Sequence, residues 1–255
     1  MSLRAFTLTT YAEEMTTLEW DGYLNARDLG GFPTALSSTG ETRFGRIARG
    51  PRRERLTETG WQDARAWGLA SIVDLRCAHE VGQGEGDHVI ADDVFEGIAI
   101  VNSPTEDQND PEFWEACAPI LDSPEYWAHN WQMQPQLVRG ALDSIASSAP
   151  GTLVHCSAGR DRTGMISALI LGNAGVDPHA VGEDYATSVH AMAHITTHAP
   201  GAELDEARSP AEVDEWMIDK LPIVHDTAAR AHEIFDLLEV SIATRAALRR
   251  LLIAE

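Results

Sequence analysis

Lysine is nearly absent from this chain of 255 residues, and positive charge is scarce overall. Lys220 is the single lysine, and 19 Lys plus Arg stand against 40 Asp plus Glu, which gives a formal net charge of −21. Because so acidic a surface repels polyanions, we expect no nucleic acid partner and no stable membrane insertion. The remaining positive charge is almost all arginine, whose planar fork binds carboxylate and phosphate groups with two hydrogen bonds at once.

Cysteine and long apolar runs are also scarce. Cys77, Cys117 and Cys156 are an odd number without a CxxC pair, which excludes a disulfide framework and a thiolate zinc site. No run reaches the ~20 apolar residues that a membrane-spanning helix needs, and the first residues lack the apolar core of a signal peptide. We therefore expect a cytoplasmic location, with export without a visible signal peptide left open.

Short apolar runs that alternate with helical patterns predict an α/β fold. Runs typical of buried strands lie at 46–48, 71–75, 98–101 and 152–154. Helical periodicity lies at 56–69 and 136–146, resumes from about Thr163 and again from 178, and continues at 211–221, 227–238 and 242–252. The alternation favours a parallel-sheet core flanked by helices, with a helical C-terminal third, in a single domain spanning 1–255.

Two stretches, 105–135 and 196–210, interrupt this order. The first is rich in proline and aromatic residues and includes Trp114, Trp127 and Trp131. Trp127 and Trp131 are one helical turn apart, so they share a face of any helix that forms there. Either stretch is a satellite core beneath a long loop or a lid over a substrate site, and the sequence leaves both interpretations open.

The clearest chemical pattern is TLVHCSAGRDRTG at 152–164, a strand that turns through seven residues into a helix. Backbone N–H groups converge at such a helix N-terminus, where the macrodipole is also positive, so a phosphate dianion binds there. Gly159 permits the sharp reversal, and Arg162, six residues after Cys156, reaches back to grip two phosphate oxygens. The predicted phosphate-binding residues are Ser157, Ala158, Gly159, Arg160, Asp161 and Arg162.

Cys156 is the predicted nucleophile of this loop. A helix N-terminus and nearby cations favour the thiolate, which is the reactive form of cysteine. The thiolate attacks phosphorus, a cysteinyl-phosphate forms, and water then releases phosphate without a metal or another cofactor. We expect His155 to orient the loop and the Thr163 hydroxyl to stabilise the departing thiolate. The agreement of His, Cys, Gly, Arg and Thr at fixed spacing speaks against an inert buried cysteine.

The segment HCSAGRDRTG resembles the HCxxGxxR[ST] signature of the protein tyrosine phosphatase superfamily. It is most similar to the bacterial tyrosine phosphatases with lipid-phosphatase-like loops. NARDLGG at 25–31 resembles their N-terminal NFRDLGG motif, VDLR at 73–76 with Glu80 resembles their DLR segment, and EDY at 183–185 also looks familial. The resemblance covers roughly 25–252 and implies the tyrosine phosphatase fold, with supporting roles for Arg27, Asp28, Arg49 and Arg76.

The resemblance offers two candidates for the general acid. Asp161 lies inside the loop, as in phosphoinositide phosphatases that carry a DRT triplet after the same turn. Asp74 ends a strand that we expect to lie beside the loop at the carboxyl edge of the sheet. We favour Asp161. The alternative roles are an ion pair with Arg160 for Asp161, and an anchor for Arg76 or the loop backbone for Asp74.

The sequence therefore predicts a phosphomonoester hydrolase, with phosphotyrosine in a phosphorylated protein as the leading substrate. A phosphoinositide or inositol phosphate phosphatase is the first alternative, because the loop carries two arginines, Arg160 and Arg162, and the DRT triplet at 161–163. The family often has lysine where Arg160 stands, and this departure leaves the substrate preference open. A phosphate-reading binding module without turnover is the second. Dual specificity stays open, and the oligomeric state is not predicted.

Two further features have alternative interpretations. Arg52 and Arg53 belong to a basic island at 43–55, which is either a solvated loop or a second phosphate site. Cys77 directly follows the DLR segment, so it is either a small buried residue or a thiol that traps Cys156 as a disulfide under oxidation.

Overall fold

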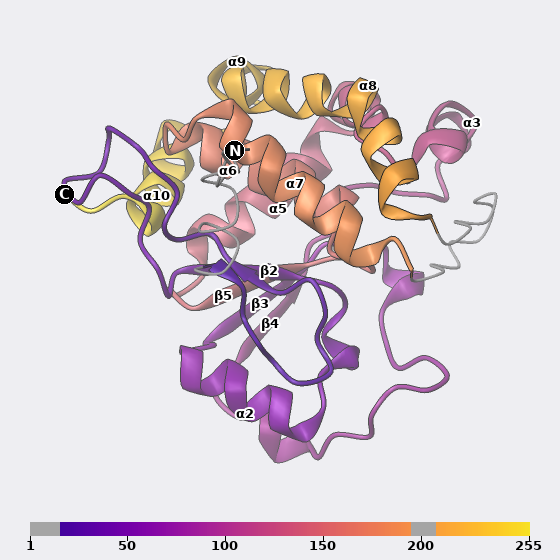
Figure 1. Cartoon of the computed structure of the whole chain (residues 1–255), viewed down its shortest axis with the longest axis vertical. Helices are drawn as coiled ribbons and strands as arrows, with labels where there is room; N and C mark the ends of the chain where they lie inside the picture. The colour runs from indigo at the N-terminus through magenta and orange to yellow at the C-terminus, as the bar shows by residue number, and fades with distance from the viewer. Residues whose placement is uncertain (1–15, 195–207) are drawn as a thin grey trace, which may run out of the picture.

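The computed structural model describes residues 16–194 and 208–255, and a five-stranded sheet lies at the centre of this part (Figure 1). The strands, in spatial order, are β1 (Arg27–Asp28), β2 (Ile47–Gly50), β5 (Thr152–His155), β3 (Ser71–Asp74) and β4 (Ala99–Asn102). β2, β5, β3 and β4 are parallel, and β1 pairs antiparallel with β2 at one edge. The predicted parallel sheet is confirmed. β1 extends it at one edge, but this strand has only two residues and is too short to give a periodic signal in the sequence.

The register of the parallel strands brings three strand ends together. His155 of β5 pairs with Gly50 of β2 on one side and with Asp74 of β3 on the other. All residues of β2, β3 and β5 are buried, as expected of central strands covered on both faces. The chain that leaves β5 at Cys156 therefore starts at the carboxyl edge, where open α/β sheets bind their ligands.

Most of the helices coincide with segments of predicted helical periodicity. They are α2 (Glu58–Trp67), α3 (Pro111–Cys117), α4 (Tyr126–Met133), α5 (Pro135–Ser147), α6 (Asp161–Asn173), α7 (Pro178–Met192), α8 (Pro210–Ala229), α9 (Ala231–Leu237) and α10 (Ile242–Leu252). Short 3-10 helices lie at Arg53–Arg55, Ala78–Glu80, Asp92–Phe95 and Ala118–Ile120. Figure 1 shows α2 on one face of the sheet and α5, α6 and α7 on the other, with α8 and α9 outermost. Within the described ranges, no helix combines the length and apolar character that crossing a membrane requires.

Side-chain caps start several helices where the sequence places them. The Thr57 side chain accepts a hydrogen bond from the Gly60 N–H at the start of α2, and Asp177 does the same for His179 at the start of α7. Both side chains satisfy N–H groups that have no partner within the helix. Pro178 follows Asp177 at the first helical position, where the missing N–H of proline costs no hydrogen bond.

The C-terminal third differs from prediction around Pro222. We expected helices at 211–221 and 227–238, but α8 continues through Pro222 to Ala229 and the break falls at Arg230. A proline inside a helix loses one hydrogen bond and crowds the preceding turn. Val213 and Met217 before the proline and Val224 after it are buried. Burial of this apolar stripe on both sides of Pro222 stabilises the continuous helix, because packing outweighs local propensity.

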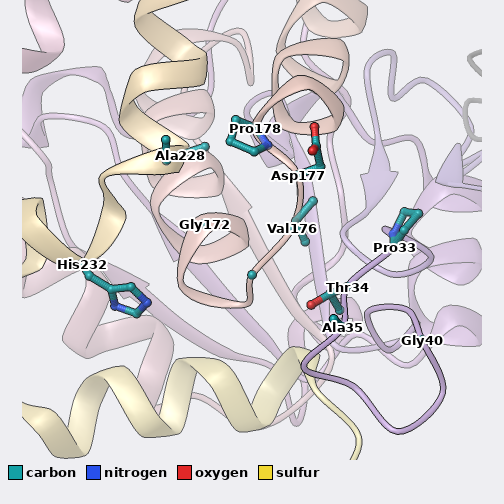
Figure 2. Close-up of a pocket in the computed structure, with 12 residues that line it drawn as sticks. Pro33, Thr34, Ala35, Gly40, Gly172, Val176, Asp177, Pro178, Ala228 and His232 are labelled. Atoms are coloured by element: carbon teal, nitrogen blue, oxygen red, sulfur yellow. The ribbon is translucent and has the colours of Figure 1, made fainter.

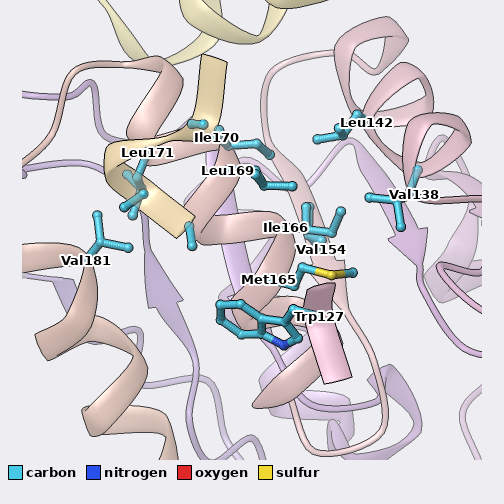
Figure 3. Packing of buried hydrophobic residues seen from close by; sticks show 14 of the residues in the cluster. Trp127, Val138, Leu142, Val154, Met165, Ile166, Leu169, Ile170, Leu171 and Val181 are labelled. Atoms are coloured by element: carbon cyan, nitrogen blue, oxygen red, sulfur yellow. The ribbon is translucent and has the colours of Figure 1, made fainter. Parts of the chain in front are cut away.

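Four aromatic side chains of 105–135 are part of the main hydrophobic core. Phe113, Tyr126, Trp127 and Trp131 are all buried, and they belong to the same cluster as the apolar face of α6. Figure 3 shows the Trp127 ring beside Met165 of α6, with Ile166 and Val154 close by. Of the second interrupting stretch, 196–207 lie outside the described residues, and 208–210 lead into α8.

Replacing Trp127 with alanine tests this packing. We expect Trp127→Ala to lower the free energy of unfolding by ~3–5 kcal/mol, because it leaves a cavity between α4 and α6. Trp114→Ala is the matched control, since Trp114 lies in the same stretch but is only partly buried. Denaturant titration of both variants measures the difference, and equal losses would contradict a core role for Trp127.

Candidate active site

The loop at 156–162 connects β5 to α6. His155 ends the strand and Asp161 begins the helix, so the predicted strand-to-helix turn is confirmed. Cys156 is only 2% exposed. Gly159 has a φ of +69°, and a Cβ there would lie 2.4 Å from the Gly50 carbonyl group. Glycine is therefore required here both for the backbone conformation and for the close approach of β2.

Protein donors bind the carbonyl oxygens of this loop. The Asn25 side-chain amide donates to the carbonyls of Ala158, at 3.1 Å, and Gly159, at 3.3 Å. The Arg49 guanidinium also donates to the Gly159 carbonyl, at 2.8 Å. Carbonyl oxygens held by protein donors do not face a bound anion, which leaves the loop amides to bind it.

A buried trio of charges holds these donors in place. Arg27 Nε donates to Asp184 Oδ1 at 2.8 Å, and Arg49 Nη1 donates to Asp184 Oδ2. Arg27 also donates to the side-chain oxygen of Asn25. Burial alone would raise the pKa of Asp184, but the two guanidinium groups hold it below its ordinary value. Asp184 of α7 therefore fixes both arginines, and through them the backbone of the loop.

Two carboxylates surround the Arg162 guanidinium. Nη2 donates to Glu80 Oε1 at 2.8 Å, and Nη1 donates to Glu80 Oε2. Glu106 Oε1 lies 3.7 Å from Nη1. Burial acts to raise the pKa of both carboxyls. At Glu80 the contacts with Arg162 outweigh burial, so the pKa of Glu80 is lowered. At Glu106 burial outweighs the attraction of Arg162, so the pKa of Glu106 is raised. Glu80 is therefore the ionised partner that positions the arginine.

The Asp161 carboxylate begins α6 and has a partner on each oxygen. Oδ1 accepts a hydrogen bond from the Tyr185 hydroxyl at 2.8 Å, and Oδ2 accepts one from Arg160 Nε at 2.9 Å. Arg160 also donates through Nη2 to the carbonyl of Asp122, at 3.1 Å. The Asp161 side chain is thus held by Tyr185 of α7 at one oxygen and by Arg160 at the other.

His155 and Asp74 lie side by side beneath the loop. His155 Nδ1 is 3.0 Å from the carbonyl oxygen of Cys156, and its Nε2 is 3.7 Å from Asp74 Oδ2. Burial lowers the pKa of His155 to about 4, so the ring is neutral at pH 7. Asp74 accepts from Arg76 at 2.9 and 2.7 Å and from Arg53 at 3.0 Å. Burial opposes ionisation of Asp74, but the Arg76 contacts lower its pKa below the ordinary value.

This arrangement places a buried cysteine, an anchored arginine and a carboxylate around the turn between β5 and α6. A model of the tyrosine phosphatase family matches residues 18–250. The chain belongs to the tyrosine phosphatase family. It is similar to the triple specificity protein phosphatase PtpB of Mycobacterium tuberculosis, with 28% identity over 199 residues, 68% of this chain and 70% of the relative. It is also similar to a tyrosine-protein phosphatase of Nostoc commune, with 32% identity over 139 residues, 53% of this chain and 46% of the relative.

The phosphatase brings most of the predicted site residues together at the carboxyl edge of the sheet. Residues 156–163 form the loop and the first turn of α6, and Arg27 and Arg49 reach the loop backbone directly or through Asn25. Asp28 does not contact the loop. It accepts from the N–H groups of Gly30 and Gly45 and from the Trp67 indole, each at 2.8 Å. Asp28 therefore braces the chain that follows β1.

Five residues of the site had no role assigned from the sequence: Asn25, Glu80, Glu106, Asp184 and Tyr185. Asn25 has a φ of +63°, a left-handed conformation that asparagine tolerates well, and it opens a motif that the sequence does show. Asp184 and Tyr185 lie in the EDY segment, which carries no chemical signal of its own. Glu106 comes from the stretch at 105–135, and only the packing of that stretch against the loop brings it to Arg162.

Arg52 and Arg53 of the basic island at 43–55 are paired with acidic residues. Arg52 forms two hydrogen bonds with the Asp87 carboxylate, and Arg53 binds Asp74. These carboxylates offset the charge of the two guanidinium groups that suggested a second phosphate site. This arrangement favours a structural role for Arg52 and Arg53.

Cys77 is a buried thiol. Its Sγ donates to the Glu106 carbonyl at 3.2 Å, and burial raises its pKa to about 12. A protonated thiol is a poor partner for disulfide exchange at neutral pH, so the structure favours the small buried residue over the redox trap. Among the described residues, no group of three or more His, Cys, Asp and Glu is arranged to hold a metal ion.

A surface hollow of about 750 Å³ lies away from this site (Figure 2). It is bounded by the chain at 33–40, the end of α6 and the start of α9, and Thr34, Val176 and His232 are among its lining residues. None of the predicted site residues lines it. The hollow is therefore separate from the phosphatase site.

The buried His155 predicts a pH dependence of stability. The unfolded chain binds more protons than the folded chain between pH 6.5 and pH 4, because burial lowers the pKa of His155 to about 4 from an ordinary 6.5. Protonation of this group therefore lowers the free energy of unfolding by ~3 kcal/mol as pH falls through that window. Above pH 6.5 His155 is neutral in both states, and the loss is absent. Urea titrations across the window should show a smaller loss for His155→Asn than for the wild type. The same loss in both proteins would refute the prediction.

Neutralising Asp184 tests the buried trio of charges. Asp184→Asn leaves Arg27 and Arg49 buried without a compensating carboxylate, so we expect the free energy of unfolding to fall by ~3–5 kcal/mol. Glu183→Gln is the matched control, because it removes one carboxylate from the neighbouring, exposed position of the same helix. Thermal denaturation measures both, and similar melting temperatures for the two variants would show that the trio contributes little.

Proposed function

We propose that this phosphatase hydrolyses phosphate monoesters of proteins, with phosphotyrosine as the leading substrate, through a cysteinyl-phosphate intermediate. The observation that carries the proposal is the loop itself, in which Cys156 and an Arg162 held by Glu80 share one helix N-terminus. The two relatives, a tyrosine-protein phosphatase and a triple specificity protein phosphatase by name, support protein substrates.

In the first step, the thiolate of Cys156 attacks phosphorus. The S–P bond forms as the P–O bond to the leaving group breaks, and Asp161 gives its proton to the leaving oxygen. The loop amides and Arg162 stabilise the negative charge on the three remaining oxygens, which is greatest in the transition state. The neutral alcohol or phenol then leaves.

In the second step, water attacks the cysteinyl-phosphate. Asp161, now a carboxylate, takes a proton from the water, the O–P bond forms, and the S–P bond breaks to release phosphate and the Cys156 thiolate. Within the described part of the chain the Thr163 hydroxyl is buried and has no hydrogen-bond partner. An unpaired hydroxyl at this position supports its proposed role as the donor that stabilises the departing thiolate.

The surroundings of the two acid candidates favour Asp161. Asp74 is 0% exposed, and Arg76 and Arg53 bind its oxygens in the ionised form. A fully buried carboxylate held ionised by two guanidinium groups is a poor proton donor. Asp161 is paired with one guanidinium, that of Arg160, and its side chain is 12% exposed. We propose that Asp74 instead positions Arg76 and His155, and that Asp161 is the acid.

The contacts of Arg160 bear on the phosphoinositide alternative. That alternative rested on the two loop arginines and the DRT triplet, and the Arg160 guanidinium is bound to Asp161 and to the Asp122 carbonyl, which limits its part in binding a second phosphate group. Phosphotyrosine therefore remains the leading substrate, and phosphoinositides belong in the substrate panel.

We also propose a single domain, since α8 packs on α6 and α7 and α10 packs on α5 and α6. A cytoplasmic location stays a prediction.

A substrate panel tests the proposed function. Wild type and Cys156→Ser are compared on a phosphotyrosine peptide, a phosphoserine peptide and a set of phosphoinositides, with a chelator present. We expect the wild type to hydrolyse the phosphotyrosine peptide fastest, and the variant to lose at least ~10³-fold in kcat. Hydrolysis of phosphoinositides alone would replace the substrate class. Binding of the peptide without hydrolysis by the wild type would favour the phosphate-reading module.

A further inference from the structure

One dipeptide of α7 contacts the proposed acid of the catalytic loop directly and the loop backbone through Arg49. Asp184 binds the arginine that holds the Gly159 carbonyl, and the next residue, Tyr185, donates its hydroxyl to Asp161 Oδ1 at 2.8 Å. The Tyr185 side chain is 1% exposed. A buried tyrosine hydroxyl needs a hydrogen-bond partner, and here the partner is the carboxylate assigned as the general acid.

The Tyr185 ring lies in a slot between α4 and α6. The Trp127 ring meets it edge-on, with centroids 5.6 Å apart and planes at 85°. A Cβ on Gly164 would lie 2.7 Å from the ring carbon Cδ2 of Tyr185. Glycine inside a helix is less favourable than alanine by ~1 kcal/mol, so α6 gives up stability at the position where the ring needs space. The two walls fix the ring, and therefore the direction of its hydroxyl.

The other oxygen of the same carboxyl has its partner within the loop. Oδ2 of Asp161 accepts from Arg160 Nε, and Arg160 in turn donates to the Asp122 carbonyl. Tyr185 is the partner that binds the carboxyl directly from another element, so it fixes the carboxyl relative to α7. A general acid must lie within hydrogen-bond reach of the leaving oxygen, and a displacement of about 1 Å costs ~10²-fold in rate.

We propose that Tyr185 is a positioning residue for the general acid Asp161, an inference that rests on the proposed function. The hydroxyl holds Oδ1, so Oδ2 is the oxygen that carries the proton. When substrate binds, Oδ2 exchanges its contact with Arg160 for one with the leaving oxygen. Tyr185 itself contacts no reacting atom.

The test is Tyr185→Phe on a series of aryl phosphates whose phenols range from acidic to weakly acidic. An acidic phenol leaves without help, whereas a weakly acidic one needs the proton from Asp161. We compare kcat/KM, because it reports the step in which the phenol leaves, whereas kcat also includes hydrolysis of the cysteinyl-phosphate, which is the same for every substrate. We expect kcat/KM to fall ~10-fold for the least acidic phenol and less than ~2-fold for the most acidic. A merely structural role would lower kcat/KM by the same factor across the series, and that result would overturn the proposal.

Tyr126→Phe is the matched control. The Tyr126 hydroxyl is also buried, but it has no hydrogen-bond partner among the described residues. This variant removes the same atom from a neighbouring tyrosine of the core, and we expect its dependence on the leaving group to match the wild type. A steeper dependence in Tyr126→Phe as well would overturn the assignment to Tyr185.

Asp161→Asn separates failure of this proposal from failure of the proposed function. If Asp161→Asn steepens the dependence on the leaving group and Tyr185→Phe does not, the positioning role is wrong and the acid assignment stands. If Asp161→Asn leaves the dependence unchanged, the acid assignment fails and the positioning role fails with it. When both variants steepen it, the double variant should equal Asp161→Asn alone, and a further loss would overturn the proposal.

Gly164→Ala provides a second route if Tyr185→Phe does not fold. The added methyl group meets the Tyr185 ring and should displace it. We expect the same selective loss for weakly acidic phenols. A loss of equal size across the series would again overturn the proposal.

Discussion

The ion pairing of Asp184 with Arg27 and Arg49 is the interaction on which the site depends. Three charged side chains lie inside the protein, and removing each from water costs several kcal/mol unless good geometry offsets it. Here the guanidinium donors are directed at the carboxylate, at Asn25 and at the Gly159 carbonyl. These contacts couple the loop to β1 and β2 at the edge of the sheet, and they couple both to α7.

This trio also explains how a chain with a net charge of −21 builds a site for an anion. Two buried arginines and one carboxylate leave a local excess of positive charge behind the loop, and the convergent amides of α6 add to it. Arg162 completes the site and needs a partner when no phosphate is bound. Glu80 is that partner, and since a guanidinium carries five N–H donors, the carboxylate does not occupy all of them.

Core packing and catalytic geometry share side chains in this protein. Trp127 fills the core between α4 and α6, and it also forms one wall of the slot that holds Tyr185. Gly164, in the first turns of α6, forms the other wall of this slot. The stretch at 105–135 therefore contributes to the site through a rigid aromatic framework, since densely packed rings restrict the positions of the groups attached to them.

The sequence by itself determined the sheet, most helix positions and the chemical character of the loop. Cys156, Gly159 and Arg162 are separated by a few residues, so the local geometry of a strand, a tight turn and a helix N-terminus places them together without help from the rest of the chain. Only the tertiary structure decided that Glu80 and Glu106 meet Arg162, that Asp28 lies away from the loop, and that Tyr185 meets Asp161. It also decided that α8 continues through Pro222. These outcomes depend on which elements pack against each other, and side-chain pairs that are distant in the chain leave no periodic or spacing signal in one sequence.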